Sequence, residues 1–153
     1  MGEKVLVTVK FKRIPGNEDI TLPRYQTPGS AAFDMHAAVI EPVTLKPGEI
    51  KLIPTGFQMA FPAKYVAQIS PRSGLALKKG IGIVNSPGMI DSDYRGEVGI
   101  ILVNHGKEDF VINRNDRVAQ IAIKKVEQAH LIESESLPTT QRGIGGYGST
   151  GTK

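Results

Sequence analysis

The sequence predicts an all-β protein, a sandwich or a barrel built as one domain. Short apolar runs recur at close spacing along the 153 residues, and Pro and Gly residues separate them. Spacing of this kind is typical of antiparallel strands joined by turns. Only one stretch favours a helix. A chain of this length, with 40% hydrophobic residues, can bury one ordinary core.

The first expected strand lies near the N-terminus, where Val5, Val7, Val9 and Phe11 alternate with other residues. Alternation places one face of a strand on the core and leaves the other face outside. Shorter apolar runs of the same kind follow along the chain. They predict strands at 43–45, 49–53, 57–61, 65–70, 97–103, 109–113, 117–124 and 126–132.

One short helix is expected from Ser73 to Lys79, because the residues between them favour a helix. Gly80 follows, and glycine suits the C-terminal cap. Ser73 is expected at the N-cap, where a hydroxyl can accept a hydrogen bond from a free backbone N–H group.

Residues 88–97, GMIDSDYRGE, interrupt an apolar run with charges. Met89 and Ile90 open the run and Val98 resumes it, so the whole stretch should be a buried β segment. A carboxylate held away from water costs several kcal/mol unless it is paired, on the order of 2–7 kcal/mol for a polar group and more for a charge. Either the chain bends here and the charges are solvated, or a functional site uses them.

The C-terminal segment has a different composition from the rest of the chain. From about Glu133 it loses apolar periodicity, and glycines crowd the stretch from Gly143 to Gly151. Without burial to offset the entropy of ordering, such a segment is mobile. We therefore expect a β domain at 1–133 and a flexible, glycine-rich arm at 134–153.

Composition excludes several classes of protein. The chain has no cysteine, and its three histidines lie far apart in sequence, so disulfides, thiolate zinc sites and cysteine nucleophiles are excluded. The first residues carry charges where a signal peptide needs an apolar core, and no apolar run is long enough to span a membrane. We expect a cytoplasmic protein that binds neither membranes nor nucleic acids.

Five segments, in order, resemble the motifs of the trimeric all-β dUTPases, the dUTP pyrophosphatases. They cover residues 28 to 151, nearly the whole chain, and five motifs in register are highly specific. The segments are PGSAAFDMHA at 28–37, SPRSGLA at 70–76, GIVNSPGMIDSDYRGE at 82–97, DRVAQ at 116–120 and the glycine-rich tail from Arg142.

The resemblance implies a jelly-roll-like subunit and a homotrimer with active sites shared between subunits. It implies hydrolysis of dUTP to dUMP and pyrophosphate, with Mg²⁺ bound through the triphosphate. The reaction removes dUTP and supplies dUMP for thymidylate synthesis.

By the same resemblance, Asp91 is the catalytic general base and Asp34 holds Mg²⁺ indirectly, through water. Tyr94 packs against the deoxyribose, and Asn85 reads the uracil edge together with the backbone around Gly88. The remaining residues that it assigns to substrate binding are Arg72, Ser73, Gly74, Met89, Ile90, Gln120, Arg142, Gly146, Tyr147, Ser149 and Thr150.

A geometric requirement follows from this assignment. Strict strand alternation places Asp91 and Tyr94 on opposite faces, so the backbone must turn between them, at Ser92 and Asp93, if both touch one ligand. Pro87 and Gly88 suit a tight hairpin beside the uracil. Two alternatives stay open at this point: a dCTP deaminase-like enzyme of the same fold, and a regulator that binds the nucleotide without turning it over.

Overall fold

The structure is a computed structural model that describes residues 6–148. This part of the chain contains eleven strands and one short helix, and every strand pair is antiparallel. The strands are β1 (Lys10–Arg13), β2 (Phe33–His36), β3 (Val43–Leu45), β4 (Ile50–Pro54), β5 (Phe57–Ala60), β6 (Tyr65–Ser70), β7 (Ile81–Ile83), β8 (Gly88–Ile90), β9 (Gly99–Asn104), β10 (Phe110–Ile112) and β11 (Arg117–Lys125). The expected all-β class is confirmed.

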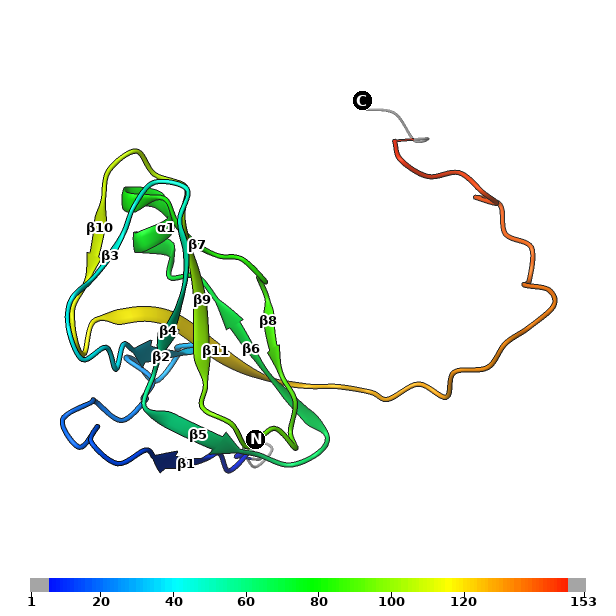
Figure 1. Cartoon of the computed structure of the whole chain (residues 1–153). Helices are drawn as coiled ribbons and strands as arrows, with labels where there is room; N and C mark the ends of the chain where they lie inside the picture. Colours follow the sequence, from blue (N-terminus) through cyan, green and yellow to red (C-terminus); the bar gives the residue numbers. More distant parts are fainter. Residues whose placement is uncertain (1–5, 149–153) are drawn as a thin grey trace.

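The strands form four small sheets that pack as a sandwich (Figure 1). The largest sheet has the order β2-β11-β6-β8, and a second sheet has the order β4-β9-β7. Two further pairs, β1-β5 and β10-β3, complete the body. Within residues 6–148 the sheets do not join into a closed barrel, so of the two expected architectures the sandwich is the one that forms.

One hydrophobic cluster from all these sheets fills the interior. Met35, Leu45, Ile100 and Ile121 are among its fully buried members. Close packing of such side chains removes apolar surface from water, which stabilises the fold by about 25 cal/mol per Å² of buried apolar surface. The two largest sheets are thereby held face to face, and the strand ends that carry the polar motifs are fixed in position.

The helix α1 (Ser73–Lys79) has the predicted bounds, and Gly80 ends it with a positive φ of 69°. A Cβ at Gly80 would also lie 2.8 Å from the Cα of Gly106, so the cap requires glycine. The predicted N-cap was wrong. Arg72 occupies that position in extended conformation without a side-chain cap hydrogen bond, and Ser73 is already helical.

Two predicted strands differ from the structure because a strand needs a partner. Lys125 pairs with Tyr65, the first residue of β6, so β11 has no neighbour beyond that point, and the strand predicted at 126–132 does not form. At the N-terminus, β1 begins only at Lys10, which pairs with Ala60, the last residue of β5. Val5 lies outside the described residues.

Two strands were missed in the sequence. β2 is buried along its whole length although it contains Asp34 and His36, and these polar residues hide it from a search for apolar runs. β7 has only three residues, with a glycine at its centre. β2 contains Asp34, and β7 precedes Asn85, so both strands carry or adjoin residues that the motifs assign to function.

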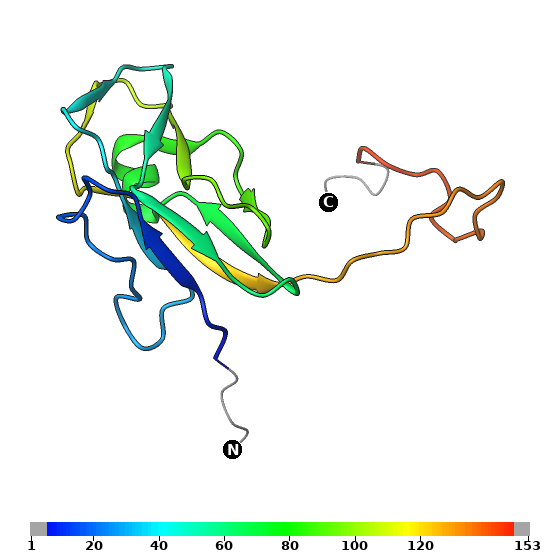
Figure 2. The ribbon, with the colours of Figure 1, turned by 60° about the horizontal axis from the view of Figure 1, so that its bottom comes forward.

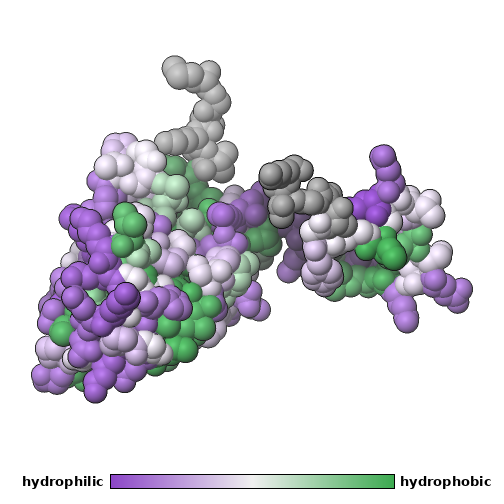
Figure 3. Space-filling model, turned by 90° about the horizontal axis from the view of Figure 1, so that it is seen from above, coloured by the Kyte–Doolittle hydropathy of each residue, from purple (hydrophilic) through white to green (hydrophobic). Residues whose placement is uncertain are grey.

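After β11 the chain leaves the body as an extended arm (Figures 1 and 2). Apart from a hydrogen bond from Val126 N to Lys64 O, it forms no backbone bond with the body over residues 126–148. Its apolar side chains Leu131, Ile132, Leu137 and Ile144 are exposed, and Figure 3 shows hydrophobic surface on the arm beside the body. The domain boundary at 133 stays a prediction.

No helix within residues 6–148 combines the length and the apolar content that crossing a membrane would require.

Candidate active site

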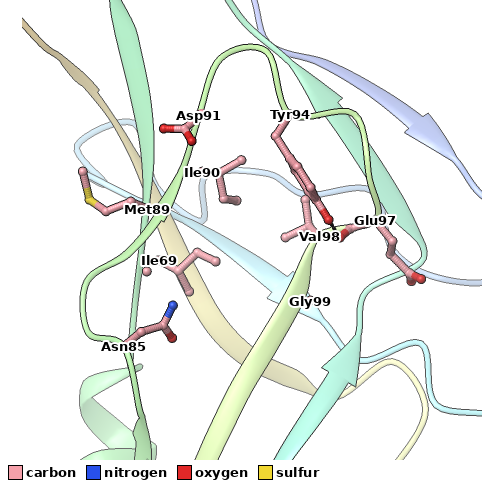
Figure 4. A pocket seen from close by; sticks show the side chains of 10 residues that line it. Ile69, Asn85, Met89, Ile90, Asp91, Tyr94, Glu97, Val98 and Gly99 are labelled. Carbon is pink, nitrogen blue, oxygen red and sulfur yellow. Dashed lines mark hydrogen bonds between the residues drawn. The ribbon is translucent and has the colours of Figure 1, made fainter. Parts of the chain in front are cut away.

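A pocket of about 200 Å³ opens beside β8, the turn that follows it and the start of β9 (Figure 4). Two of the residues that line it, Ile69 and Val98, are buried. The predicted site residues that present side chains or backbone here all come from the third motif. The full lining is Ile69, Asn85, Gly88, Met89, Ile90, Asp91, Tyr94, Glu97, Val98 and Gly99.

The turn required between Asp91 and Tyr94 is present. The backbone N–H of Tyr94 donates to the carbonyl of Asp91 at 3.2 Å, with Ser92 and Asp93 at the corner. Both Asp91 and Tyr94 therefore line one pocket. The expectation of a buried β segment through 88–97 was wrong, because the sheet ends at Ile90 and Asp91 is exposed.

Tyr94 is held in a defined orientation although it is exposed. Its hydroxyl donates to the carbonyl of Glu97 at 3.1 Å, which closes the loop across Gly96 (Figure 4). A Cβ on Gly96 would collide with the ring, 2.9 Å from Cε2. Gly96 thus provides the space that the aromatic ring occupies.

Asn85 lies at the other end of the pocket, in the turn after β7 (Figure 4). Gly88 begins β8, and a Cβ there would lie 3.3 Å from the Asn85 amide nitrogen and 3.2 Å from the Cβ of Ile69. Glycine keeps this backbone close to the pocket. The predicted hairpin was wrong: β7 pairs with β9 and β8 with β6, so Pro87 lies in a connection between two sheets.

Within β8 only alternate residues face inward. Gly88 and Ile90 are buried, and Met89 is exposed with its side chain on the other side of the strand (Figure 4). The Met89 sulfur accepts from the Gln68 amide at 3.4 Å. Met89 therefore contributes mainly backbone to this pocket.

A second group of predicted residues lies where β2, β11 and the loop before α1 meet. Arg72 Nε lies 3.3 Å from Asp34 Oδ1, and Arg117 Nη1 lies 3.1 Å from Asp34 Oδ2. Gln120 donates to the carbonyl of Pro71 at 3.0 Å. Ser73 and Gly74 follow, exposed, in the first turn of α1. Arginines, a hydroxyl and an amide make this a surface suited to an anion.

A β-bulge creates this group. Strict alternation would place Arg117 and Gln120 on opposite faces of β11, but the register with β2 shifts between Arg117 and Ala119. Gln120 then pairs with Asp34 while the Arg117 side chain also reaches that carboxylate. Bulges commonly redirect a side chain in this way.

His36 adds a polar group that the sequence left unassigned. It is buried, and its Nδ1 has no hydrogen-bond partner within the described residues. Burial lowers the pKa of His36; nearby Asp34 acts in the opposite direction, and Arg117 and Arg72 add to the lowering. Burial and the neighbouring guanidiniums thus favour the neutral form of this imidazole.

The structure does not bring all predicted residues together in one chain. None of Arg72, Ser73, Gly74 and Gln120 lines the pocket that contains Asp91. Arg142 and Tyr147 lie in the extended arm, where Arg142 Nε donates to the carbonyl of Gly145 and Tyr147 is exposed; Gly146 lies between them, half-exposed. Ser149 and Thr150 lie outside the described residues.

Sequence reasoning missed several members of the two groups. Ile69, Glu97, Val98 and Gly99 line the pocket, and only the fold brings Ile69 of β6 next to β8. Arg117 belongs to the fourth motif, but no role was predicted for it. The signal that could have identified it is a charged residue at the start of an apolar run, since Arg117 begins β11. Glu97 gives no signal in sequence, since its backbone carbonyl makes the contact with Tyr94.

A hard metal ion prefers several oxygen ligands gathered at one place. Residues 6–148 contain no group of three or more His, Asp or Glu side chains able to hold a metal ion. Each oxygen of Asp34 faces a guanidinium group, and these two positive charges disfavour a direct metal bond. Each oxygen still has a lone pair that can accept a hydrogen bond from water. This donor set fits Mg²⁺ that keeps several waters, as Mg²⁺ commonly does.

Comparison with known proteins now defines the class. The sequence matches the family model described as dUTPase over residues 18–151. It is 52% identical over 149 residues to the deoxyuridine 5'-triphosphate nucleotidohydrolase of Maricaulis maris, with 96% of this chain and 98% of the relative covered. The chain therefore belongs to the dUTPase family.

Solved structures agree on the fold. The dUTPase of Staphylococcus bacteriophage 80alpha with dUPNHPP superposes with a TM-score of 0.84 at 24% identity, over 95% of this chain and 99% of that one. A mutant dUTPase from phage phi11 of S. aureus, described for its coordination of a structural Mg(II) ion, gives a TM-score of 0.76 at 23% identity, over 86% of this chain and 99% of that one.

Proposed function

We propose that the protein hydrolyses dUTP to dUMP and pyrophosphate. The observation that carries the proposal is the turn at Ser92 and Asp93, which presents Asp91 and Tyr94 to one pocket with Asn85 in a chain of the dUTPase family. The reaction needs a base and an aromatic wall on the same nucleotide. An ordinary β-strand could not supply both from positions 91 and 94.

Asp91 acts as the general base. It orients a water molecule and removes its proton as the water oxygen attacks the α-phosphorus, and pyrophosphate leaves from the opposite side. Its exposed position at the pocket rim leaves room for that water. General-base catalysis contributes about 10²–10⁴-fold to such a rate, and positioning of the clamped triphosphate supplies much of the remainder.

The pocket selects the nucleoside. The Asn85 side chain offers both an acceptor and donors to the uracil edge, and Gly88 lets the backbone approach the base closely. Cytosine exchanges an acceptor for a donor, which leaves polar groups unpaired, and such a mismatch can cost about 10⁴-fold. The fixed ring of Tyr94 fills the space that a ribose 2′-hydroxyl would need.

The second group binds the phosphates. Arg72, Ser73, Gly74 and Gln120 contact the triphosphate, and Asp34 accepts hydrogen bonds from the water shell of Mg²⁺. When bound, Mg²⁺ neutralises part of the triphosphate charge. The arm closes over the bound nucleotide and excludes competing water molecules. The arm residues that take part are Arg142, Gly146, Tyr147, Ser149 and Thr150.

The site is shared between subunits of a homotrimer. Within residues 6–148 no arginine or lysine lines the pocket of Asp91, whereas a triphosphate needs cationic partners. The arm exposes apolar side chains that its own body does not cover. Both features favour an assembly in which one copy supplies the nucleoside pocket and another supplies the arginines or the arm. The expected cytoplasmic location stays a prediction.

One assay tests the proposal. Pyrophosphate release is measured from dUTP, dCTP, dTTP and UTP, with and without Mg²⁺. Strong preference for dUTP is expected, and equal cleavage of all four would contradict the roles of Asn85 and Tyr94. Ammonia release from dCTP would instead indicate the deaminase-like alternative, and tight dUTP binding without turnover would indicate the regulator.

A further inference from the structure

We infer that Arg117 is a positioning residue that holds Arg72 in place and keeps it available for the triphosphate. The inference rests on the proposed function, because it concerns how the phosphate-binding group of that same site is built. Arg117 has no role in the motif assignment, and it touches Arg72 and Asp34 directly.

The three residues form a closed ring of contacts. Arg72 Nε lies 3.3 Å from one oxygen of Asp34, and Arg117 Nη1 donates to the other oxygen at 3.1 Å. Arg72 Nη1 also donates to the backbone carbonyl of Arg117 at 3.1 Å. Arg117 therefore holds the Arg72 guanidinium twice, once through its own carbonyl and once through the shared carboxylate.

Backbone structure supports the same ring from both sides. Arg117 stands at the β-bulge of β11, and Gln120 on that strand pairs with Asp34 of β2. The Gln120 amide in turn holds the carbonyl of Pro71, the residue before Arg72. Arg72 itself lies in the loop before α1, but the groups that hold its guanidinium come from β2 and β11.

The charge balance of the ring depends on Arg117. Asp34 carries one negative charge and its side chain is only 10% exposed. Paired with Arg72 alone it would form a neutral pair, with the guanidinium directed to the carboxylate rather than to a ligand. With Arg117 the group sums to one positive charge, so Arg72 keeps attraction for an anion while it is held in place.

Substitution of Arg117 by Met removes the positive charge and the N–H donors of the guanidinium group, and it keeps most of the side-chain volume. We expect Arg117→Met to weaken binding of a non-hydrolysable imido analogue of dUTP by about ten- to thirtyfold, since Arg72 then pairs with Asp34 alone and its charge-assisted contact with the phosphates is weakened. Affinity for deoxyuridine, which has no phosphate, should stay within about twofold of the original. A merely structural role would weaken both ligands together.

Coupling to Arg72 gives the decisive measurement. Titration calorimetry compares Arg72→Met, Arg117→Met and the double variant; in the Arg72→Met background the second substitution should cost less than about twofold. The inference is overturned if the two substitutions cause additive losses of affinity for the imido analogue. It is also overturned if Arg117→Met weakens the binding of deoxyuridine as much as the binding of the analogue. Lys124→Met removes one exposed positive charge from the same strand and serves as the matched control.

Binding and turnover separate the two proposals. If the protein binds the analogue with the expected coupling but does not cleave dUTP, the inference on Arg117 stands and the proposed hydrolysis is wrong. Thermal unfolding of each variant, at one protein concentration, shows whether it is folded. If Arg117→Met does not fold, Arg117→Gln is measured in its place with the same expectations.

Discussion

The hydroxyl end of the Tyr94 ring occupies the space in which a Cβ at Gly96 would lie, so that any side chain at position 96 would overlap it. The Tyr94 hydroxyl fixes this arrangement by donating to the carbonyl of Glu97. One glycine therefore decides where the wall of the nucleoside pocket stands. The relationship is invisible in sequence, because both residues lie in a stretch without regular structure.

Substitution Gly96→Ala should move the Tyr94 ring and weaken the exclusion of a ribose. We expect the preference for dUTP over UTP, measured as the ratio of kcat/KM values, to fall about tenfold, since one displaced contact of this size is worth about 1–3 kcal/mol. Gly29→Ala is the matched control, because a Cβ at Gly29 meets no atom within 4 Å. If the ratio of kcat/KM values for dUTP and UTP is unchanged in Gly96→Ala, Tyr94 does not select the sugar.

Substitution Asp91→Asn should abolish most turnover and preserve binding. The amide cannot accept the proton of the attacking water, so kcat is expected to fall by about 10²–10⁴-fold. Dissociation constants for the imido analogue should change little. Asp93→Asn, an exposed acid in the same turn, is the control and should retain near-normal kcat; near-normal kcat in Asp91→Asn would end the assignment of the base.

Removal of Mg²⁺ should affect the enzyme only when nucleotide is present. Residues 6–148 provide no cluster of three metal-binding side chains, so the protein alone should bind Mg²⁺ weakly. We expect Mg²⁺ to leave the thermal midpoint of the free protein unchanged and to raise it further in the presence of the imido analogue. A large Mg²⁺-dependent shift without nucleotide would point to a direct protein site.

Truncation after Leu137 should separate binding of the nucleoside from turnover. The truncated chain loses Arg142 and Tyr147 but keeps every strand and the whole pocket of Asp91. We expect deoxyuridine affinity to persist and kcat for dUTP to fall at least about tenfold, because closure over the phosphates is lost. Light scattering shows whether the oligomeric mass is unchanged. If it is, and the truncated protein is fully active, the arm is not part of the active site.

Acid should weaken the ion pair between Asp19 and Arg114. Two guanidinium nitrogens lie 2.7 Å from the two carboxylate oxygens, and this hydrogen bonding lowers the pKa of Asp19 below its ordinary value. A lowered folded-state pKa means that the unfolded state binds more protons in acid. The stabilisation is therefore complete above about pH 4 and disappears as pH falls through the folded-state pKa.

Urea unfolding at pH 7 and pH 3, at one protein concentration, measures this effect. The difference in unfolding free energy between the original protein and Asp19→Asn should be larger at pH 7 than at pH 3. Asp109→Asn, at another exposed acid that forms no ion pair within residues 6–148, is the control for removal of one carboxylate. A difference that grows towards pH 3 would have the wrong sign for this ion pair.

Local structure was predicted well where local chemistry decides it. The helix has the expected bounds because Gly80 ends it, and the strands at 43–45 and 65–70 match their apolar runs. The turn between Asp91 and Tyr94 was predicted from the two faces of a strand and is present. Each of these depends on neighbours in sequence, which the sequence displays.

Features that depend on distant partners were not predicted. The apolar run at 126–132 forms no strand because β6 begins at Tyr65 and offers no partner beyond Lys125. The hairpin at Pro87 fails because β7 and β8 join different sheets. In both cases hydrogen-bond partners, and not propensity, decide whether a short segment is a strand.

The all-β class, the family and the set of polar residues available for chemistry can be read from the sequence, since they follow from composition, periodicity and motif order. Which of those residues act as a unit depends on how the strands and turns pack in three dimensions. The bulge in β11 directs Arg117 to the carboxylate that also holds Arg72, and Gly96 makes room for Tyr94. The first of these contacts depends on the register between strands far apart in the chain. The second depends on how a turn without regular structure folds, and neither can be read from a local pattern.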